Sequence, residues 1–260
     1  MQPAHPARWH AVVLGGGDPD DPLARAHSSL VKPLVPIHGQ PMAAYVLRSL
    51  RESGQIARIH YVGPSDPGLD GLFDEQLPDQ GSLLANLRQG AQRCPPGDRI
   101  LAVSADIPML RPDQLAQLIG ALPGEAGLVY PIVPKEACDR EYPGVKRTYV
   151  RLRDGTFTGG NVIAFDPALL ERAWPLLQQV VRLRKNPLGL ARLIGLKVLY
   201  RLLAGQLSLA ELEERVSQIL AVPVRALVTQ HAAIGTDVDK ESDLTLAAQQ
   251  LSGRPTGSVP

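Results

Sequence analysis

A run of glycines and a lysine stand at a spacing that suits nucleotide binding. An apolar run at 11–14 leads directly into Gly15, Gly16 and Gly17. Glycines adopt positive φ freely and let the backbone come close to a ligand, so main-chain N–H groups in such a loop can face a phosphate or a base edge. A cation at Lys32 could reach the same phosphates. A tight structural turn is the alternative explanation of the glycines.

A carboxylate follows a second apolar run. Residues 100–103 are apolar, and Asp106 comes three residues later in Ser104-Ala-Asp106-Ile-Pro108. The next helix is expected only at Pro112, so helix capping explains Asp106 poorly. Enzymes that act on a triphosphate need a divalent ion to neutralise it, and Mg²⁺ prefers one or two carboxylates together with phosphate oxygens and water. Asp106 is therefore a candidate Mg²⁺ ligand.

Several other kinds of site are excluded, because the chain lacks the sequence motifs that they require. The glycine loop has no Gly-Lys-Ser/Thr, so it is not a Walker A loop, and it lacks the G-x-G-x-x-G spacing of dinucleotide-binding folds. The histidines show no metal-ligand spacing, and no G-x-S-x-G elbow of a serine hydrolase is present.

The stretch from Arg25 to Leu34 resembles the start of the GT-A-type nucleotidyltransferases. It reads Arg25-Ala-His-Ser28-Ser-Leu30-Val-Lys32-Pro-Leu34, and Gly39-Gln-Pro41-Met42 follows. The family has R-x-x-S-x-L-x-K-x-L after a glycine-rich loop. The chain thus looks like a MobA-like NTP transferase, related to molybdenum-cofactor guanylyltransferases and sugar-phosphate nucleotidyltransferases.

This resemblance implies roles for the first residues. Lys32 and Arg25 would stabilise charge on the α-phosphate and the departing pyrophosphate, and Leu14 with the three glycines would bind the nucleotide. The chain departs from the family pattern at 18–24, an inserted segment that lengthens the loop before Arg25.

The resemblance also implies a second metal ligand. Gly235-Thr-Asp237-Val-Asp239-Lys-Glu-Ser-Asp243-Leu244 is similar to the family's closing D-x-D-T-P-E-D-L element. Asp239 is the expected partner of Asp106 at Mg²⁺, with Asp237 as the alternative. An ordinary N-cap of the last helix is the other explanation of Asp239.

Two further elements resemble the base and acceptor sites of these enzymes. Gly81, Ser82 and Asn86 match the loop and helix that read the nucleobase. The alternative makes Ser82 a helix N-cap and places Asn86 on a solvated face. Gly160 and Asn161 match a G-N element near the ribose and acceptor, and glycines within a strand suggest a close approach.

Basic residues follow the core of the chain. Lys146 and Arg147 form one pair, and Arg184-Lys185-Asn186 is another basic cluster. Their position suggests that they bind the acceptor phosphate, while a solvated surface is the alternative.

Strand and helix patterns alternate in the first half of the chain. Strands are expected at 12–14, 59–62, 100–103 and 129–133, with helices at 41–53, 82–93 and 112–122. Short helical crossovers imply parallel strands, whose ligands bind at the carboxyl ends. With the resemblance, this predicts an α/β fold: a three-layer Rossmann-like (GT-A) mostly parallel sheet flanked by helices, with a C-terminal helical appendage.

The second half is less regular. We expect a hairpin of residues 146–153 and 157–165 with an Asp154-Gly155 turn, a helix after Asp166, a strand at 224–228 and a closing helix. We assign residues 1–180 and 221–251 to the nucleotidyltransferase domain and 187–220 to a leucine-rich helical insertion beside the acceptor. The tail, 252–260, is expected to be disordered.

Composition limits the partners. The chain has 260 residues, 44% of them hydrophobic, and a net charge of +1, which gives no electrostatic argument for nucleic acid or an anionic membrane. Only two cysteines are present, and the N-terminus has no apolar signal segment, so a cytoplasmic location is expected. No apolar run is long enough to span a membrane. The apolar stretch at 187–220 makes a homodimer one option.

Together these elements predict a Mg²⁺-dependent nucleotidyltransferase. The implied reaction joins an NMP from an NTP to a phosphorylated acceptor, molybdopterin-like or a sugar phosphate, and releases pyrophosphate. Two alternatives remain open: a non-catalytic nucleotide-binding module and a GT-A glycosyltransferase, which uses a D-x-D metal motif.

Overall fold

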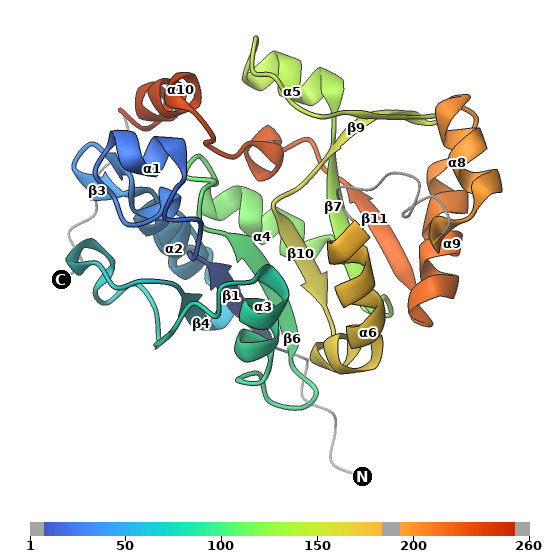
Figure 1. The fold of residues 1–260 in the computed structure, drawn as a ribbon, viewed down its shortest axis with the longest axis horizontal. Coiled ribbons are helices and arrows are strands. Elements are labelled where there is room, and N and C mark those ends of the chain that lie inside the picture. The colour runs from blue at the N-terminus through green and yellow to red at the C-terminus, as the bar shows by residue number, and fades with distance from the viewer. Residues whose placement is uncertain (1–7, 184–192, 253–260) are drawn as a thin grey trace.

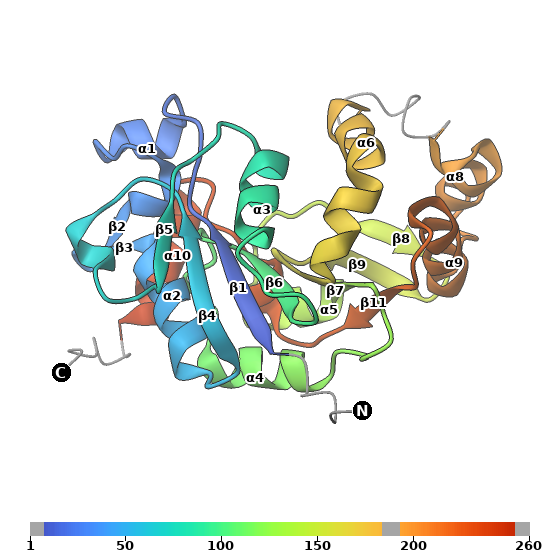
Figure 2. The same ribbon diagram turned by 90° about the horizontal axis from the view of Figure 1, so that it is seen from below.

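The chain folds around one large mixed β-sheet with helices on both faces (Figures 1 and 2). The computed structural model describes residues 8–183 and 193–252, and within these ranges the large sheet has nine strands. Its strands are β1 (Trp9–Leu14), β4 (Ile56–Val62), β5 (Glu75–Leu77), β6 (Arg99–Ser104), β7 (Leu128–Pro134), β8 (Val150–Leu152), β9 (Gly155–Gly159), β10 (Val162–Phe165) and β11 (Val224–Val228). A separate short antiparallel pair consists of β2 (Pro36–Ile37) and β3 (Gln40–Pro41). The expected Rossmann-like α/β class is confirmed.

Helices fill the layers above and below this sheet. The α-helices are α1 (Pro22–Ala26), α2 (Met42–Glu52), α3 (Leu83–Ala91), α4 (Pro112–Gly120), α5 (Lys135–Glu141), α6 (Pro167–Leu183), α8 (Leu196–Leu203), α9 (Leu209–Leu220) and α10 (Glu241–Leu251). Three short 3₁₀ turns are also described: η1 (Lys32–Leu34), η2 (Pro67–Leu69) and η3 (Ala232–Gly235). Figure 2 shows α2 and α4 on one face, and α3, α6, α8 and α9 on the other.

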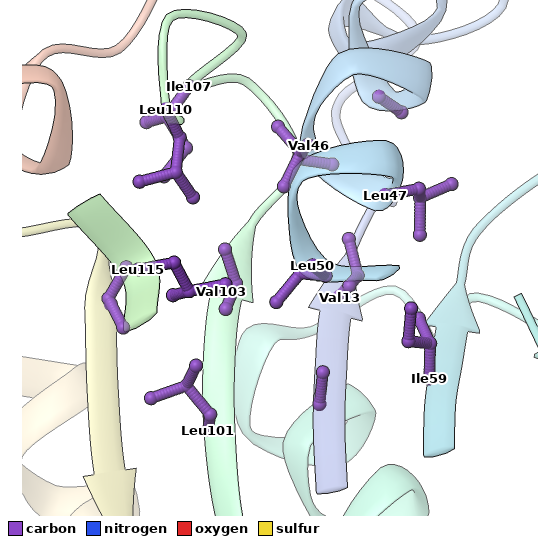
Figure 3. Close-up of a cluster of buried hydrophobic side chains, with 14 of the residues drawn as sticks. Val13, Val46, Leu47, Leu50, Ile59, Leu101, Val103, Ile107, Leu110 and Leu115 are labelled. Atoms are coloured by element: carbon purple, nitrogen blue, oxygen red, sulfur yellow. The ribbon is translucent and has the colours of Figure 1, made fainter. Parts of the chain in front are cut away.

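The first half of the sheet is parallel and buried on both faces. Its strand order is β5-β4-β1-β6. Val13 faces the cluster that α2 and α4 complete, and Val12 faces the cluster that α3 and α6 complete. Figure 3 shows the first cluster, in which Val46, Leu47 and Leu50 of α2 lie over the strands. Burial on both faces explains why these strands are continuous apolar runs in the sequence.

The second half of the sheet differs from the expected hairpin. The hairpin of β8 and β9 is confirmed, but Leu152 pairs with Gly155, so the turn is Arg153-Asp154 rather than Asp154-Gly155. The expected strand 157–165 is interrupted at Gly160-Asn161.

That interruption is a shift in pairing along β7. Ile132 pairs with Gly159, whereas Val129 pairs with Ala164, so β9 and β10 follow β7 in different registers. Beyond the shift, β10 lies between β6 and β7, antiparallel to both. Bulges of this kind bend a strand and redirect its side chains, often beside active sites.

The described part of the predicted insertion forms α8 and α9. The buried Leu207 between them packs with Ile132, Leu152 and Phe157 of the sheet. Ser208 and Glu211 form a capping box at the start of α9. Residues 187–192 of that insertion, the basic cluster 184–186 and the tail after Ser252 lie outside the described residues. Among the described helices, none has both the length and the apolar character needed to cross a membrane.

Candidate active site

The glycine loop and Asp106 leave the sheet side by side. Leu14, the last residue of β1, pairs with Ser104, the last residue of β6. The N–H of Ala105 donates a hydrogen bond to the Leu14 carbonyl at 3.1 Å. The sheet order changes direction around β1, and ligands of such sheets bind at carboxyl ends near that point.

Three carboxylates meet above these strand ends. Oxygens of Asp106, Asp237 and Asp239 all lie within 4.8 Å of one another. The Val238 N–H donates to the Asp106 carbonyl at 3.0 Å, which holds the segment of the other two aspartates against the end of β6. Asp239 is not the N-cap of α10, because Lys240 occupies that position without a side-chain cap. The capping interpretation of Asp239 is therefore wrong.

Lys32 lies within this acidic cluster. Its Nζ is 2.7 Å from Asp106 Oδ2 and also donates to Asp239 Oδ1, and its side chain is 17% exposed. Burial alone would lower the pKa of Lys32, but the attraction and hydrogen bonds of Asp106 and Asp239 outweigh it and raise the pKa. Lys32 is therefore a fixed cation at this site.

One lysine does not balance three carboxylates. Burial raises the pKa of Asp237 to about 6, and the charges of Asp106 and Asp239 add to the effect. A further positive charge would relieve this repulsion. The ligand atoms are all carboxylate oxygens, which hard cations such as Mg²⁺ prefer. The residues of the cluster thus fit a Mg²⁺ ion.

The glycine loop is packed against neighbouring residues. A Cβ on Gly15 would lie 2.2 Å from the Tyr61 ring, and a Cβ on Gly16 would lie 2.2 Å from the Asp79 carboxylate. A Cβ on Gly17 would meet only Val31, at ordinary contact distance. The Tyr61 ring therefore leaves no room for a side chain at position 15, whereas a side chain at position 16 would displace the Asp79 carboxylate.

Asp79 joins this loop to the predicted base-reading segment. Its carboxylate accepts hydrogen bonds from Gly17 N–H at 3.3 Å, Gly81 N–H at 2.8 Å and Asn86 Nδ2 at 2.8 Å. Desolvation raises the pKa of Asp79, but these hydrogen bonds outweigh it and lower the pKa. Asp79 could not be predicted as a site residue from the sequence, where its only signal is its position two residues before Gly81.

Ser82 and Asn86 have well-defined structural positions. Ser82 caps α3 by accepting a hydrogen bond from the Ala85 N–H at 3.2 Å. Asn86 is buried, and its Oδ1 also accepts from the Gln80 N–H at 2.7 Å. The solvated-face interpretation of Asn86 is therefore wrong, since this side chain shapes the loop before α3.

Asn161 lies at the bulge between β9 and β10. Its N–H donates to the Ile234 carbonyl at 2.7 Å, and its own carbonyl accepts from the Ser104 N–H at 2.9 Å. A Cβ on Gly160 would come within 2.9 Å of Ile234 and of the Pro131 carbonyl, so only glycine fits there. At the bulge, the backbone of Asn161 is therefore hydrogen-bonded both to the end of β6 and to η3.

A polar pocket of about 440 Å³ adjoins the acidic cluster. It is lined by Lys146, Arg147, Thr148, Thr158, Gly159, Asn161, Gly235, Asp237 and Asp239. Arg147 Nε donates to the Gly235 carbonyl at 3.1 Å, and its Nη2 donates to Thr236 Oγ1. Lys146 is exposed at the rim. The predicted basic pair and Asn161 therefore share one pocket with two of the aspartates.

Arg25 is placed differently from Lys32. It lies in α1, its side chain is 65% exposed, and its described ion pair is with Asp20. Asp20 belongs to the inserted segment, which forms a loop and the first turn of α1. The insertion thus supplies Arg25 with a local carboxylate, and no described contact links it to Lys32.

The chain is similar to known proteins in sequence and in fold. A family model for a MobA-like NTP transferase domain matches residues 11–223. A solved structure of a hypothetical transferase from Thermus thermophilus shares 45% sequence identity with a TM-score of 0.83, covering 91% of this chain and 99% of that one.

More distant relatives share part of the chain or the fold. The bifunctional protein GlmU of Xanthomonas oryzae pv. oryzae is 31% identical over 128 residues, which are 46% of this chain and 27% of GlmU. This chain therefore matches only about a quarter of the length of that relative. The structure of CMP:2-keto-3-deoxy-manno-octonic acid synthetase complexed with CTP shares 14% identity with a TM-score of 0.63, covering 95% of this chain and 99% of that one. This last similarity shows the fold alone.

Proposed function

Because the chain belongs to the MobA-like NTP transferase family, we propose that it transfers an NMP from an NTP to a phosphorylated small-molecule acceptor. An acceptor phosphate oxygen bonds to the α-phosphorus of the NTP, and the bond from that phosphorus to the bridging oxygen of the β-phosphate breaks. The products are an NDP-linked acceptor and pyrophosphate. The contact of Lys32 with the aspartates beside the glycine loop carries this proposal.

The acceptor needs no general base. Its phosphate is already ionised at pH 7, so the attacking oxygen has no proton to lose. Catalysis then rests on positioning the two phosphates and stabilising their charge. Lys32 provides a fixed cation for the α-phosphate and the departing pyrophosphate. When bound, Mg²⁺ supplies further positive charge to the triphosphate, and Asp106 would hold it together with Asp237 or Asp239.

The nucleotide is assigned to the glycine side of the site. The triphosphate would lie along the glycine loop, in which Gly15 N–H donates to the Val62 carbonyl and Gly17 N–H to Asp79. The segment from Gly81 to Asn86 would face the base. Asp79 accepts hydrogen bonds from both segments, so it sets their spacing. That Arg25 stabilises charge on the pyrophosphate remains a prediction, because the described ion pair of Arg25 is with Asp20.

The acceptor is assigned to the polar pocket on the other side of the cluster. Arg147 is anchored at its rim by η3, and Lys146 adds an exposed cation. Asn161 and Gly160 form the bulge that brings β9 toward the aspartates. Two cations beside the metal site suit an acceptor that carries a phosphate.

The proposal is tested by pyrophosphate release. The full chain is incubated with each of the four NTPs, Mg²⁺ and a panel of sugar phosphates, alkyl phosphates and a molybdopterin-like phosphate. Release that requires both an NTP and a phosphorylated acceptor is expected. If nucleotide binds but no acceptor supports turnover, the chain is a nucleotide-binding module. Transfer of sugar from an NDP-sugar in place of the NTP would instead favour the glycosyltransferase alternative, in which Asp237 and Asp239 act as a D-x-D motif.

A further inference from the structure

A second, apolar pocket lies between α9 and the sheet. It has a volume of about 390 Å³ and lies over β7, β8, β9 and β11. Leu212 and Val216 of α9 form one wall, and Tyr130, Leu152 and Phe157 of the strands form the opposite wall. Figure 2 shows α9 on the same face of the sheet as α6.

This space is larger than packing defects in protein interiors. Interiors are packed as densely as organic crystals, with few voids larger than a water molecule. Small-molecule sites usually measure about 300–1,000 Å³ and are mostly apolar. Tyr130 remains 36% exposed although it lies among apolar side chains. The volume and lining therefore suit an apolar ligand group.

The apolar pocket adjoins the polar acceptor pocket at β9. Thr158 and Gly159 line both pockets. The Thr158 side chain faces Gly235 on the polar side, since a Cβ on Gly235 would lie 3.1 Å from Thr158 Cγ2. Phe157 packs on the apolar side with Leu152.

The backbone of β9 forms the boundary between the two pockets, and its pairing with β8 ends at Phe157, so its edge is unpaired at Gly159. Gly159 has no side chain, and Tyr130 Oη occupies the space 2.1 Å from where a Cβ would stand. The phenol ring of Tyr130 therefore lies at the boundary, with its hydroxyl toward β9. Any larger residue at 159 would have to displace this ring.

We propose that the acceptor is amphipathic: a phosphate monoester whose phosphate lies in the polar pocket and whose alkyl or prenyl chain lies in the apolar pocket. This inference rests on the proposed function, because it extends the acceptor site of the same reaction. The phosphate meets Lys146 and Arg147. The chain bends round the edge of β9 at Gly159, where the pairing with β8 has ended, and lies against Leu212 and Val216. Specificity would then come from apolar burial as well as from the phosphate.

The test is a series of n-alkyl phosphates from ethyl to decyl. In the pyrophosphate assay, kcat/KM should rise about threefold to fourfold with each methylene that enters the pocket, and level off once the pocket is full. Isothermal titration calorimetry of the same phosphates, without NTP, should show tighter binding and a more negative heat-capacity change as the chain lengthens.

A pocket-filling variant provides the structural control. Val216→Trp places a large ring in the apolar pocket, and Gln218→Trp places the same ring on the exposed side of α9. Val216→Trp should remove the chain-length dependence of binding and leave ethyl phosphate unaffected, whereas Gln218→Trp should retain it. Circular dichroism melting identifies a variant that has not folded. Should Val216→Trp not fold, Leu212→Phe tests the same wall with a smaller change.

The outcomes separate the two proposals. Turnover with acceptors at a rate independent of chain length, in wild type and Val216→Trp alike, overturns the amphipathic acceptor and keeps the nucleotidyltransferase. Chain-length-dependent binding that Val216→Trp abolishes, with no pyrophosphate from any NTP, supports the pocket and overturns the proposed reaction. If Val216→Trp and Gln218→Trp weaken the binding of the long-chain phosphates equally, the assignment of the chain to this pocket is overturned.

Discussion

Lys32 is the residue on which the charge balance of the site depends. It is the cation that contacts Asp106 and Asp239 in the acidic cluster, and its side chain is mostly buried. Removing it would leave the carboxylates facing one another, a situation that already raises the pKa of Asp237. The same cation is available to a triphosphate, so its structural and chemical roles coincide.

We predict that Lys32→Ala lowers kcat about 10²- to 10³-fold, because charge that develops in the transition state loses a preorganised partner. Pyrophosphate release measures this effect. Lys135→Ala is the matched control, since Lys135 is an exposed lysine of α5 whose ion pair is with Asp139 and whose ammonium lies over the Tyr149 ring, away from the aspartate cluster. Turnover of Lys32→Ala close to that of Lys135→Ala would remove Lys32 from the mechanism.

A second prediction distinguishes Asp237 from Asp239. With a chelator at pH 7.5, Asp237→Asn should raise the free energy of unfolding by about 1 kcal/mol, because it removes a buried carboxylate whose ionisation its neighbours oppose. Asp239→Asn should have a smaller effect, since the Asp239 side chain is 64% exposed. Thermal melts in increasing Mg²⁺ measure ligation, because an ion that binds the folded state raises the melting temperature.

If both aspartates bind the ion, Mg²⁺ should raise the melting temperature of wild type more than that of either variant. An equal rise in all three proteins would contradict the metal assignment. A reduced rise in only one variant would identify the second ligand, which the sequence left open between the two positions.

The sequence predicted the residues that follow apolar strands more readily than those in loops. Asp106 and the glycine loop both follow such strands. Because the carboxyl ends of parallel strands lie at the same edge of the sheet, their proximity could be predicted. Asp79 has no such signal, because its partner Gly17 is 62 residues away and the two meet only once both loops are folded. The partners of Asn86, Gln80 and Asp79, are only six and seven residues earlier, but they lie in an irregular loop that periodicity does not describe.

At the scale of elements, β9 and β10 show what periodicity cannot determine. We expected the residues from Phe157 to Phe165 to form one strand, although Gly159-Gly160-Asn161 within it is typical of a bulge. The interruption arises because β10 pairs with β6 as well as β7, while β9 pairs with β7 and β8. Long-range pairing thus creates the bulge that positions Asn161.

The corner between α8 and α9 provides a prediction at this scale. Leu207 is 2% exposed and packs on the β8–β9 hairpin, whereas Leu203, one turn earlier, is 79% exposed. Leu207→Ala should lower the free energy of unfolding by about 2–5 kcal/mol, and Leu203→Ala by less than about 0.5 kcal/mol. Urea denaturation measures both. Equal losses would mean that α8 and α9 do not dock as described.

At the scale of the molecule, the sheet has two halves with different predictability. The parallel half has strands buried on both faces, which appear in the sequence as apolar runs joined by helices. The antiparallel half contains short strands, with Val150 exposed and Leu152 buried on β8. Its pairing depends on β11, which comes late in the chain and lies parallel to β7. The nucleotide side could therefore be predicted more fully than the acceptor side.

A buried histidine pair links the elements of the parallel half. His10 Nδ1 of β1 is 3.3 Å from His60 Nε2 of β4. His10 Nε2 lies 3.1 Å from Asp98, before β6, and His60 Nδ1 lies 3.1 Å from Glu75 of β5. Both rings are buried, so a positive charge on either of them would lose its hydration.

This network predicts how the stability of the molecule depends on pH. Burial lowers the pKa of His60, and the hydrogen bond and charge of Glu75 only partly oppose that effect. The unfolded chain then binds more protons, so stability is complete above about pH 6.5 and falls as the pH drops toward the folded-state pKa. Between pH 7 and 5, His60→Gln should lose about 1 kcal/mol less of its unfolding free energy than wild type in urea titrations. His38→Asn, at an exposed turn position with positive φ, should behave as wild type. A wild-type slope in His60→Gln would place the acid sensitivity elsewhere, because the strands would then be held together without regard to the protonation of this pair.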